Sequence, residues 1–139
     1  MGFFMTIREN DWVYLKVLLS EQMQIDERFL IHPDDVHLIK NDLHFGLLKC
    51  ISFKDGYYNF IGNENTFVRA LKGAVSKKMP APKFDFEEEV IDLTKSNHLV
   101  IGSISNISFH SVRNEYMYFI VVEGKKKSRR YFADELEKR

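Results

Sequence analysis

The sequence predicts an α+β protein, and three observations lead to this prediction. The chain has 139 residues, of which 45% are apolar, which is enough for one compact domain or two small ones. Within residues 1–78, apolar residues recur at helical spacing on both sides of one clear hairpin signal. After the proline-containing segment 79–83, short apolar runs separated by turn residues indicate strands throughout residues 84–139. We therefore expect an N-terminal module, a linker and a C-terminal all-β domain over these three ranges.

The first of three expected helices covers about residues 10–23. An Asn-Asp pair stands where a helix would be capped, and Trp12, Leu15 and Met23 recur near helical spacing. The same stretch is rich in β-branched and aromatic residues, which favour extended backbone. A buried strand is therefore the alternative to this helix.

Two further helices are expected over about 33–43 and 64–72, on either side of a hairpin over about 47–61. Pro33 suits the first turn of a helix, where its missing amide hydrogen is not needed. An Asp-Gly pair between two apolar runs is the hairpin signal. An asparagine near the start of the third helix can cap it.

Residues 84–139 look like a small SH3-like β-barrel. The runs FDFEEEVIDL, VIGSISNISFH, NEYMYFIVVEG and RRYFADELE carry this resemblance, with a glycine near the start of the second strand and a tyrosine-rich third strand. The resemblance implies short strands that close on themselves, in a fold that hosts many unrelated binding roles. The full prediction is an α+β fold in which a small N-terminal α/β-hairpin module precedes a C-terminal SH3-like β-barrel.

Residues 104–132 also resemble small cytoplasmic immunity-type proteins of Gram-positive polymorphic toxin systems. The phrase GKKKSRRYFADELE, which follows a tyrosine-rich strand, carries this second resemblance. It implies that the protein neutralises a cognate bacterial toxin by direct binding. No catalytic residue transfers with it.

Charge is balanced over the whole chain, with 20 Lys and Arg against 20 Asp and Glu, so a general attraction to nucleic acid is not expected. Two clusters stand out locally. The acidic cluster, our candidate protein-binding site, comprises Asp85, Glu87, Glu88 and Glu89. The basic turn, our candidate anion- or nucleic-acid-binding site, comprises Lys125, Lys126, Lys127, Arg129 and Arg130. The alternative for each is a solvated surface that binds nothing.

No residue pattern points to catalysis, to a metal site or to a cofactor. The five histidines lack the short spacings that hold a metal, and no phosphate-binding glycine loop is present. Cys50 lies inside an apolar run and is expected to be a small core residue. A single cysteine and the absence of an apolar run of about 20 residues predict a cytoplasmic protein that does not enter membranes.

The sequence thus predicts a non-enzymatic protein-binding module, with another protein as its partner. If the second resemblance holds, that partner is a toxin domain. The alternative function is RNA binding through the basic turn, where nearby aromatic rings would stack on bases.

Overall fold

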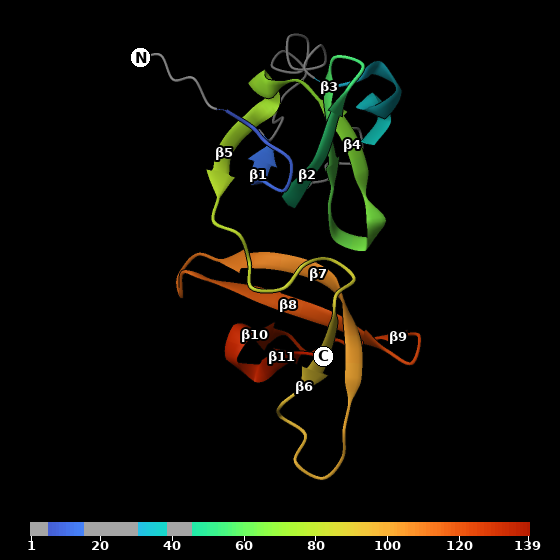
Figure 1. The fold of residues 1–139 in the computed structure, drawn as a ribbon, viewed down its shortest axis with the longest axis vertical. Coiled ribbons are helices and arrows are strands. Elements are labelled where there is room, and N and C mark those ends of the chain that lie inside the picture. The colour runs from blue at the N-terminus through green and yellow to red at the C-terminus, as the bar shows by residue number, and fades with distance from the viewer. Residues whose placement is uncertain (1–5, 16–30, 39–45) are drawn as a thin grey trace. The chain divides into compact units, whose positions relative to one another are not determined.

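The computed structural model describes residues 6–15, 31–38 and 46–139 (Figure 1). The chain divides into two compact units, residues 1–81 and 82–139, which we call unit 1 and unit 2. The division falls inside the segment 79–83, the predicted linker. Each unit is built on its own antiparallel sheet. Within the described ranges, no helix is long and apolar enough to cross a membrane.

Unit 1 contains a five-stranded antiparallel sheet in the order β4-β3-β2-β1-β5. Its strands are β1 (Trp12–Leu15), β2 (Leu47–Lys54), β3 (Tyr57–Ile61), β4 (Phe67–Ala70) and β5 (Val75–Met79). Three short 3-10 helices accompany them: η1 (Pro33–Leu38), η2 (Asn63–Asn65) and η3 (Lys72–Ala74). The hairpin expected over 47–61 corresponds to β2 and β3, whose turn holds Asp55 and Gly56 at positive φ.

One face of this sheet packs on the core of unit 1. Alternate residues of each strand supply that core, so Val13 and Leu15 of β1 face the same way as Phe60 of β3. The opposite face of β2, β3 and β4 carries Ser52, Lys54, Tyr57, Asn59, Phe67 and Arg69. We call this opposite face the outer face of unit 1.

The prediction of three helices in the N-terminal module is largely wrong. Residues 12–15 form β1, because Val13 and Leu15 alternate inward with period two, and 16–23 lie outside the described residues. The second helix is a 3-10 helix over 33–38, with 39–43 outside the description. In place of the helix over 64–72, β4 pairs with β3 between two 3-10 helices, because burial of Val68 and Ala70 outweighs the local capping signal.

Unit 2 contains an antiparallel sheet in the order β10-β8-β7-β6-β11, with β9 paired to β8. Its strands are β6 (Glu89–Asp92), β7 (Ile101–His110), β8 (Glu115–Val122), β9 (Lys125–Lys126), β10 (Tyr131–Phe132) and β11 (Leu136–Lys138). The 3-10 helix η4 (Ala133–Glu135) joins β10 to β11. β10 and β11 are the first and last strands in this order, at opposite edges of the sheet. Because only η4 connects them, the sheet must curve strongly to bring its two edges together.

The interior of unit 2 is filled by large side chains from the curved sheet and from the segment before β6. Phe84 and Tyr118 are buried and meet edge to face, with ring centroids 5.1 Å apart. The hydroxyl of Tyr118 accepts a hydrogen bond from the amide of Lys83 at 2.9 Å. A register shift in β7 between Ile104 and Asn106 lets both Ile104 and Ile107 point inward.

The predicted fold class is therefore wrong. The protein is nearly all β, with two antiparallel sheets and no α-helix among the described residues, instead of a helix-containing module followed by a single SH3-like β-barrel. The physical reason is strand pairing. The short strands of unit 1 bury one side chain in two and satisfy their backbone groups with each other, which outweighs local helix signals.

Gly102 of β7 is required by close packing, which gives a prediction about unit 2. A Cβ atom at this position would lie 2.9 Å from the carbonyl oxygen of Val121 and 3.1 Å from side-chain atoms of Ile120 and Val122. We expect Gly102→Ala to lower the free energy of unfolding of unit 2 by about 1–3 kcal/mol, because backbone must move. Amide hydrogen exchange in β7 and β8 measures this loss. Ser103→Ala is the matched control, and an equal loss in both variants would contradict the packing argument.

Candidate functional site

A groove of about 690 Å³ crosses unit 2 between two segments that are distant in the sequence. One side comes from the β6–β7 loop, residues 93–100, and the other from residues 122–131, which include the turn after β8. Three cations, Lys95, Lys127 and Arg129, line it against one exposed carboxylate, Glu123, so we call it the cationic groove.

Two buried residues, Asp92 and Tyr131, form the base of the cationic groove. The Tyr131 hydroxyl donates a hydrogen bond of 2.7 Å to the Asp92 carboxylate, 39 residues away in the sequence. Thr94 donates to the same carboxylate from its amide at 2.8 Å and from its hydroxyl at 2.5 Å. A single carboxylate thus ties the start of the β6–β7 loop to β10 and fixes the two sides of the groove.

The electrostatics of this base favour an ionised aspartate and a protonated tyrosine. Burial alone would raise the pKa of the Asp92 carboxyl, but the hydrogen bonds from Thr94 and Tyr131 outweigh it and hold the pKa below the usual 3.8. Burial and the hydrogen bond to Asp92 raise the pKa of Tyr131 to about 12. The Tyr131 hydroxyl therefore acts as a structural donor at neutral pH.

Aliphatic side chains line much of the rest of the groove. Val100, Ile101 and Val122 are half-buried, whereas Leu99 is 69% exposed. An exposed leucine beside partly exposed valine and isoleucine is apolar surface that a bound partner would remove from water. At about 25 cal/mol per Å² of buried apolar area, such surface contributes to binding.

The cations of the groove differ in how firmly they are held. Arg129 lies over the ring of Tyr131, 4.9 Å from its centroid, and forms a 2.9 Å ion pair with Glu135. Glu135, the last residue of η4, also accepts a hydrogen bond from the amide of Phe132, so the residue that holds Arg129 is itself held in place. Lys95 and Lys127 are exposed on opposite sides of the groove. An anionic ligand would meet an oriented guanidinium and two solvated ammonium groups, and it would have to avoid the exposed carboxylate of Glu123.

The predicted basic turn is thus divided between different surroundings. Lys125 and Lys126 form β9 and are exposed, and Lys127 and Arg129 line the groove. The Arg130 guanidinium lies 5.7 Å from the ring centroid of Phe132 and contacts the sulfur of Met117 at 3.7 Å. The sequence shows this cation cluster directly, but it gives no local sign of Lys95, His98 or Leu99, which reach the groove from 30 residues away.

The predicted acidic cluster has structural partners within unit 2. Glu88 accepts a hydrogen bond from the amide of Asp85 at 2.9 Å and lies 3.7 Å from the ammonium of Lys138. Glu89 pairs with Arg139 at 3.0 Å. The carboxylate of Asp85 accepts a hydrogen bond of 2.7 Å from the amide of Phe86.

Glu87 is exposed and has a positive φ of 63°, as in a tight turn. The acidic cluster therefore shapes the turn before β6, and its contacts with Lys138 and Arg139 offset much of its charge.

Neither the cysteine nor the possible metal ligands form a reactive site among the described residues. Cys50 is 1% exposed in the core of unit 1, and burial raises the pKa of its thiol. Over the part of the chain that the structure describes, no group of three or more His, Cys, Asp or Glu side chains is placed to hold a metal ion.

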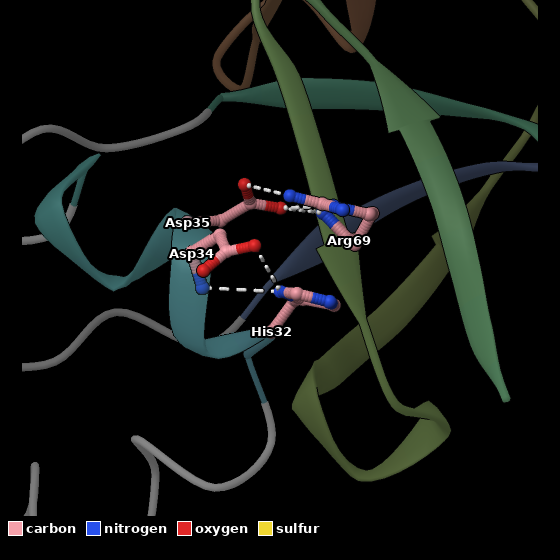
Figure 2. Close-up of polar contacts among 4 residues, drawn as sticks. All are labelled: His32, Asp34, Asp35 and Arg69. Atoms are coloured by element: carbon pink, nitrogen blue, oxygen red, sulfur yellow. Dashed lines mark hydrogen bonds and ion pairs between the residues drawn. The ribbon is translucent and has the colours of Figure 1, made fainter. Parts of the chain in front are cut away.

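Unit 1 contains a second polar cluster, which sequence reasoning missed. Figure 2 shows Asp35 beside Arg69 of β4, whose backbone amide, Nε and Nη2 all donate to the Asp35 carboxylate at 2.7–2.9 Å. Burial alone would raise the pKa of Asp35, but the hydrogen bonds from Arg69 lower it, so the pair is ionised at neutral pH. In the sequence, Asp35 resembles only an acidic residue in a first helical turn.

His32 lies next to this pair. Its Nδ1 accepts a hydrogen bond from the amide of Asp34 at 3.0 Å (Figure 2). The His32 ring lies 4.8 Å from that of Tyr57 on the outer face of unit 1. The segment 31–35 is thus fixed at the edge of β4.

Comparison with known protein families shows which family the chain resembles. The model of a family of unknown function, DUF6960, matches residues 7–137 and so spans both units. No curated protein and no solved structure matches the chain.

The Asp92 carboxylate generates a prediction about stability and pH. We expect Asp92→Asn to lower the stability of unit 2 by about 1–3 kcal/mol at pH 7, because Thr94 and Tyr131 lose a charged acceptor. Since the folded pKa is lowered, this contribution is present above the usual pKa of 3.8 and is lost as the pH falls through the folded value.

The difference between wild type and Asp92→Asn should therefore shrink in acid. This stability difference can be measured by amide hydrogen exchange of residues 92–100 in both proteins, from neutral to acidic pH. A difference that stays constant or grows in acid would be inconsistent with an ionised Asp92 as the anchor.

Proposed function

The chain belongs to the DUF6960 family, and we propose that it is a non-enzymatic protein-binding module whose cationic groove takes an acidic segment of a partner protein. The supporting observation is the combination of exposed Leu99 with the cations Lys95 and Lys127 in one groove of about 690 Å³. Apolar surface provides binding energy, and the cations select the charge of the partner.

The preformed shape of the groove supports its role as a binding site. The bonds from Thr94 and Tyr131 to Asp92 hold its two sides, and the ring of Tyr131 supports Arg129. A partner that enters a groove with a set shape loses less affinity to ordering of the binding site. Arg and Tyr are also the residue types that most often dominate protein interfaces.

The groove is a better candidate interface than the acidic cluster. Glu88 and Glu89 already have cationic neighbours in Lys138 and Arg139, and Asp85 takes part in the turn before β6. A partner at the acidic cluster would have to displace those contacts. Lys95 and Lys127 offer exposed positive charge next to apolar surface.

Nucleic acid is the alternative ligand, and one observation favours it. Unit 2 has a second hollow of about 390 Å³, which is lined by Lys126, Lys127 and Phe119. The ring of Phe119 offers a surface on which a base could stack. We favour a protein segment because the larger groove is lined by aliphatic side chains and its Tyr131 ring is buried beneath Arg129.

The resemblance to immunity-type proteins stays a prediction, and it specifies the partner further. In that case the acidic segment belongs to a toxin domain, and the complex covers a functional surface of the toxin. We place this module in the cytoplasm, a proposal supported by its single, unpaired cysteine.

A charge-reversal experiment tests the proposed function. We expect a fluorescent peptide of alternating glutamate and leucine to bind the full chain, and the double variant Lys95→Glu, Lys127→Glu to bind it at least about tenfold more weakly. Fluorescence anisotropy at two salt concentrations measures the dissociation constants. A peptide of alternating glutamine and leucine should bind more weakly than the acidic one.

The matched control is the double variant Lys72→Glu, Lys77→Glu, which makes the same change in net charge on unit 1. It should bind the acidic peptide like wild type. Three results would count against the proposal: no binding of the acidic peptide, an equal loss in the control, or a single-stranded oligonucleotide that displaces the peptide and binds more tightly.

A further inference from the structure

The outer face of unit 1 carries a hollow of about 370 Å³. Its middle row is formed by Ser52, Asn59 and Arg69, which lie side by side in the register of β2, β3 and β4. Tyr57 and His32 stand at one end of the hollow and Phe67 at the other. This volume lies within the range of sites for small ligands.

Aromatic rings bound this hollow on two sides. Phe67 is 43% exposed, and Tyr57 is half-buried against the ring of His32. Tyr57 lies four residues along β3 from Ile61, the partner of Phe67, so the backbone positions of Tyr57 and Phe67 are about 13 Å apart along the strands at 3.3 Å per residue. A ligand that contacts both rings must be elongated and must present more than one apolar face.

The polar groups between the rings are held in place. The amide nitrogen of Asn59 donates to the hydroxyl of Ser52 at 3.0 Å, and Asn59 is only 8% exposed. Arg69 is fixed by its hydrogen bonds to Asp35. Asn, Ser and Arg side chains together provide donors and acceptors for hydroxyl groups, with little ordering needed on binding.

The charges around the hollow cancel. Arg69 lines the hollow, and its guanidinium forms an ion pair of 2.8 Å with the carboxylate of Asp35, which neutralises it (Figure 2). Lys54 and its chain neighbour Asp55 both lie at the rim. Phosphate-rich ligands depend on uncompensated cations for their affinity. A balanced site with exposed rings therefore favours a neutral ligand over a nucleic acid.

We propose that this hollow binds a neutral oligosaccharide, with the C–H faces of sugar rings against Phe67 and Tyr57 and sugar hydroxyls on Asn59, Ser52 and Arg69. Such a ligand alternates apolar faces with hydroxyl groups, is uncharged and is long enough to span both rings. This binding is independent of the cationic groove of unit 2.

NMR titration of the full chain with three trisaccharides tests the proposal: β-1,4-linked glucose, α-1,4-linked glucose and β-1,4-linked N-acetylglucosamine. We expect at least one to bind with a dissociation constant of about 1 mM and to shift amides of β2, β3 and β4. Its affinity should be the same at about 0.05 M and 0.5 M salt, because the ligand is neutral. Phe67→Ala should weaken binding about tenfold, and Tyr57→Ala should also weaken it.

Phe53→Ala is the matched control. Phe53 is an exposed aromatic residue of β2 that packs on Tyr58, on the other side of the same sheet. It should leave the affinity unchanged. The proposal is overturned if no trisaccharide saturates the hollow at about 10 mM, if Phe53→Ala weakens binding as much as Phe67→Ala, or if a nucleoside monophosphate or a short peptide binds there while the sugars do not.

Discussion

The hydrogen bond from Tyr131 to the Asp92 carboxylate is the contact on which the proposed binding surface of unit 2 depends. Asp92 ends β6 and Tyr131 begins β10, two strands that are not neighbours in the sheet. Their bond brings together the β6–β7 loop and the segment after β8, and the ring of Tyr131 supports Arg129. This ionised carboxylate therefore links the two sides of the groove directly, in addition to the pairing of β6, β7 and β8.

Unit 1 also contains a buried aspartate that accepts several hydrogen bonds. Asp35, like Asp92, is a buried aspartate whose carboxylate accepts several hydrogen bonds and whose pKa is lowered by them. Asp35 fixes the segment 31–35 to the edge of β4, as Asp92 fixes the β6–β7 loop to β10. In both units a buried carboxylate helps backbone hydrogen bonds to attach an irregular segment to a short antiparallel sheet, and a hollow lies beside the attachment. The lining of the groove in unit 2 has more cations than exposed carboxylates, whereas Arg69 in the hollow of unit 1 is paired with Asp35, and for this reason we assign them ligands of different chemistry.

Sequence reasoning succeeded where the signal is local. The Asp-Gly turn between two apolar runs marks β2 and β3, and the alternation in Tyr116, Tyr118 and Ile120 marks β8. It failed for β1 and β4, which have four residues each and are too short to establish period two. Asn65 has the residue type of a helix cap, but it ends the 3-10 helix η2 with a positive φ of 63°. The bond between Asp92 and Tyr131 spans 39 residues and leaves no local pattern, so the cationic groove could not be predicted.

The most direct test of our account is to locate a bound acidic segment on the protein. We would add a spin-labelled peptide of alternating glutamate and leucine to the isotopically labelled full chain and measure paramagnetic broadening of its amides. The account predicts the strongest broadening at residues 93–101 and 122–129 and weaker broadening at residues 85–89. Broadening centred on residues 85–89, or spread evenly over both units, would contradict it.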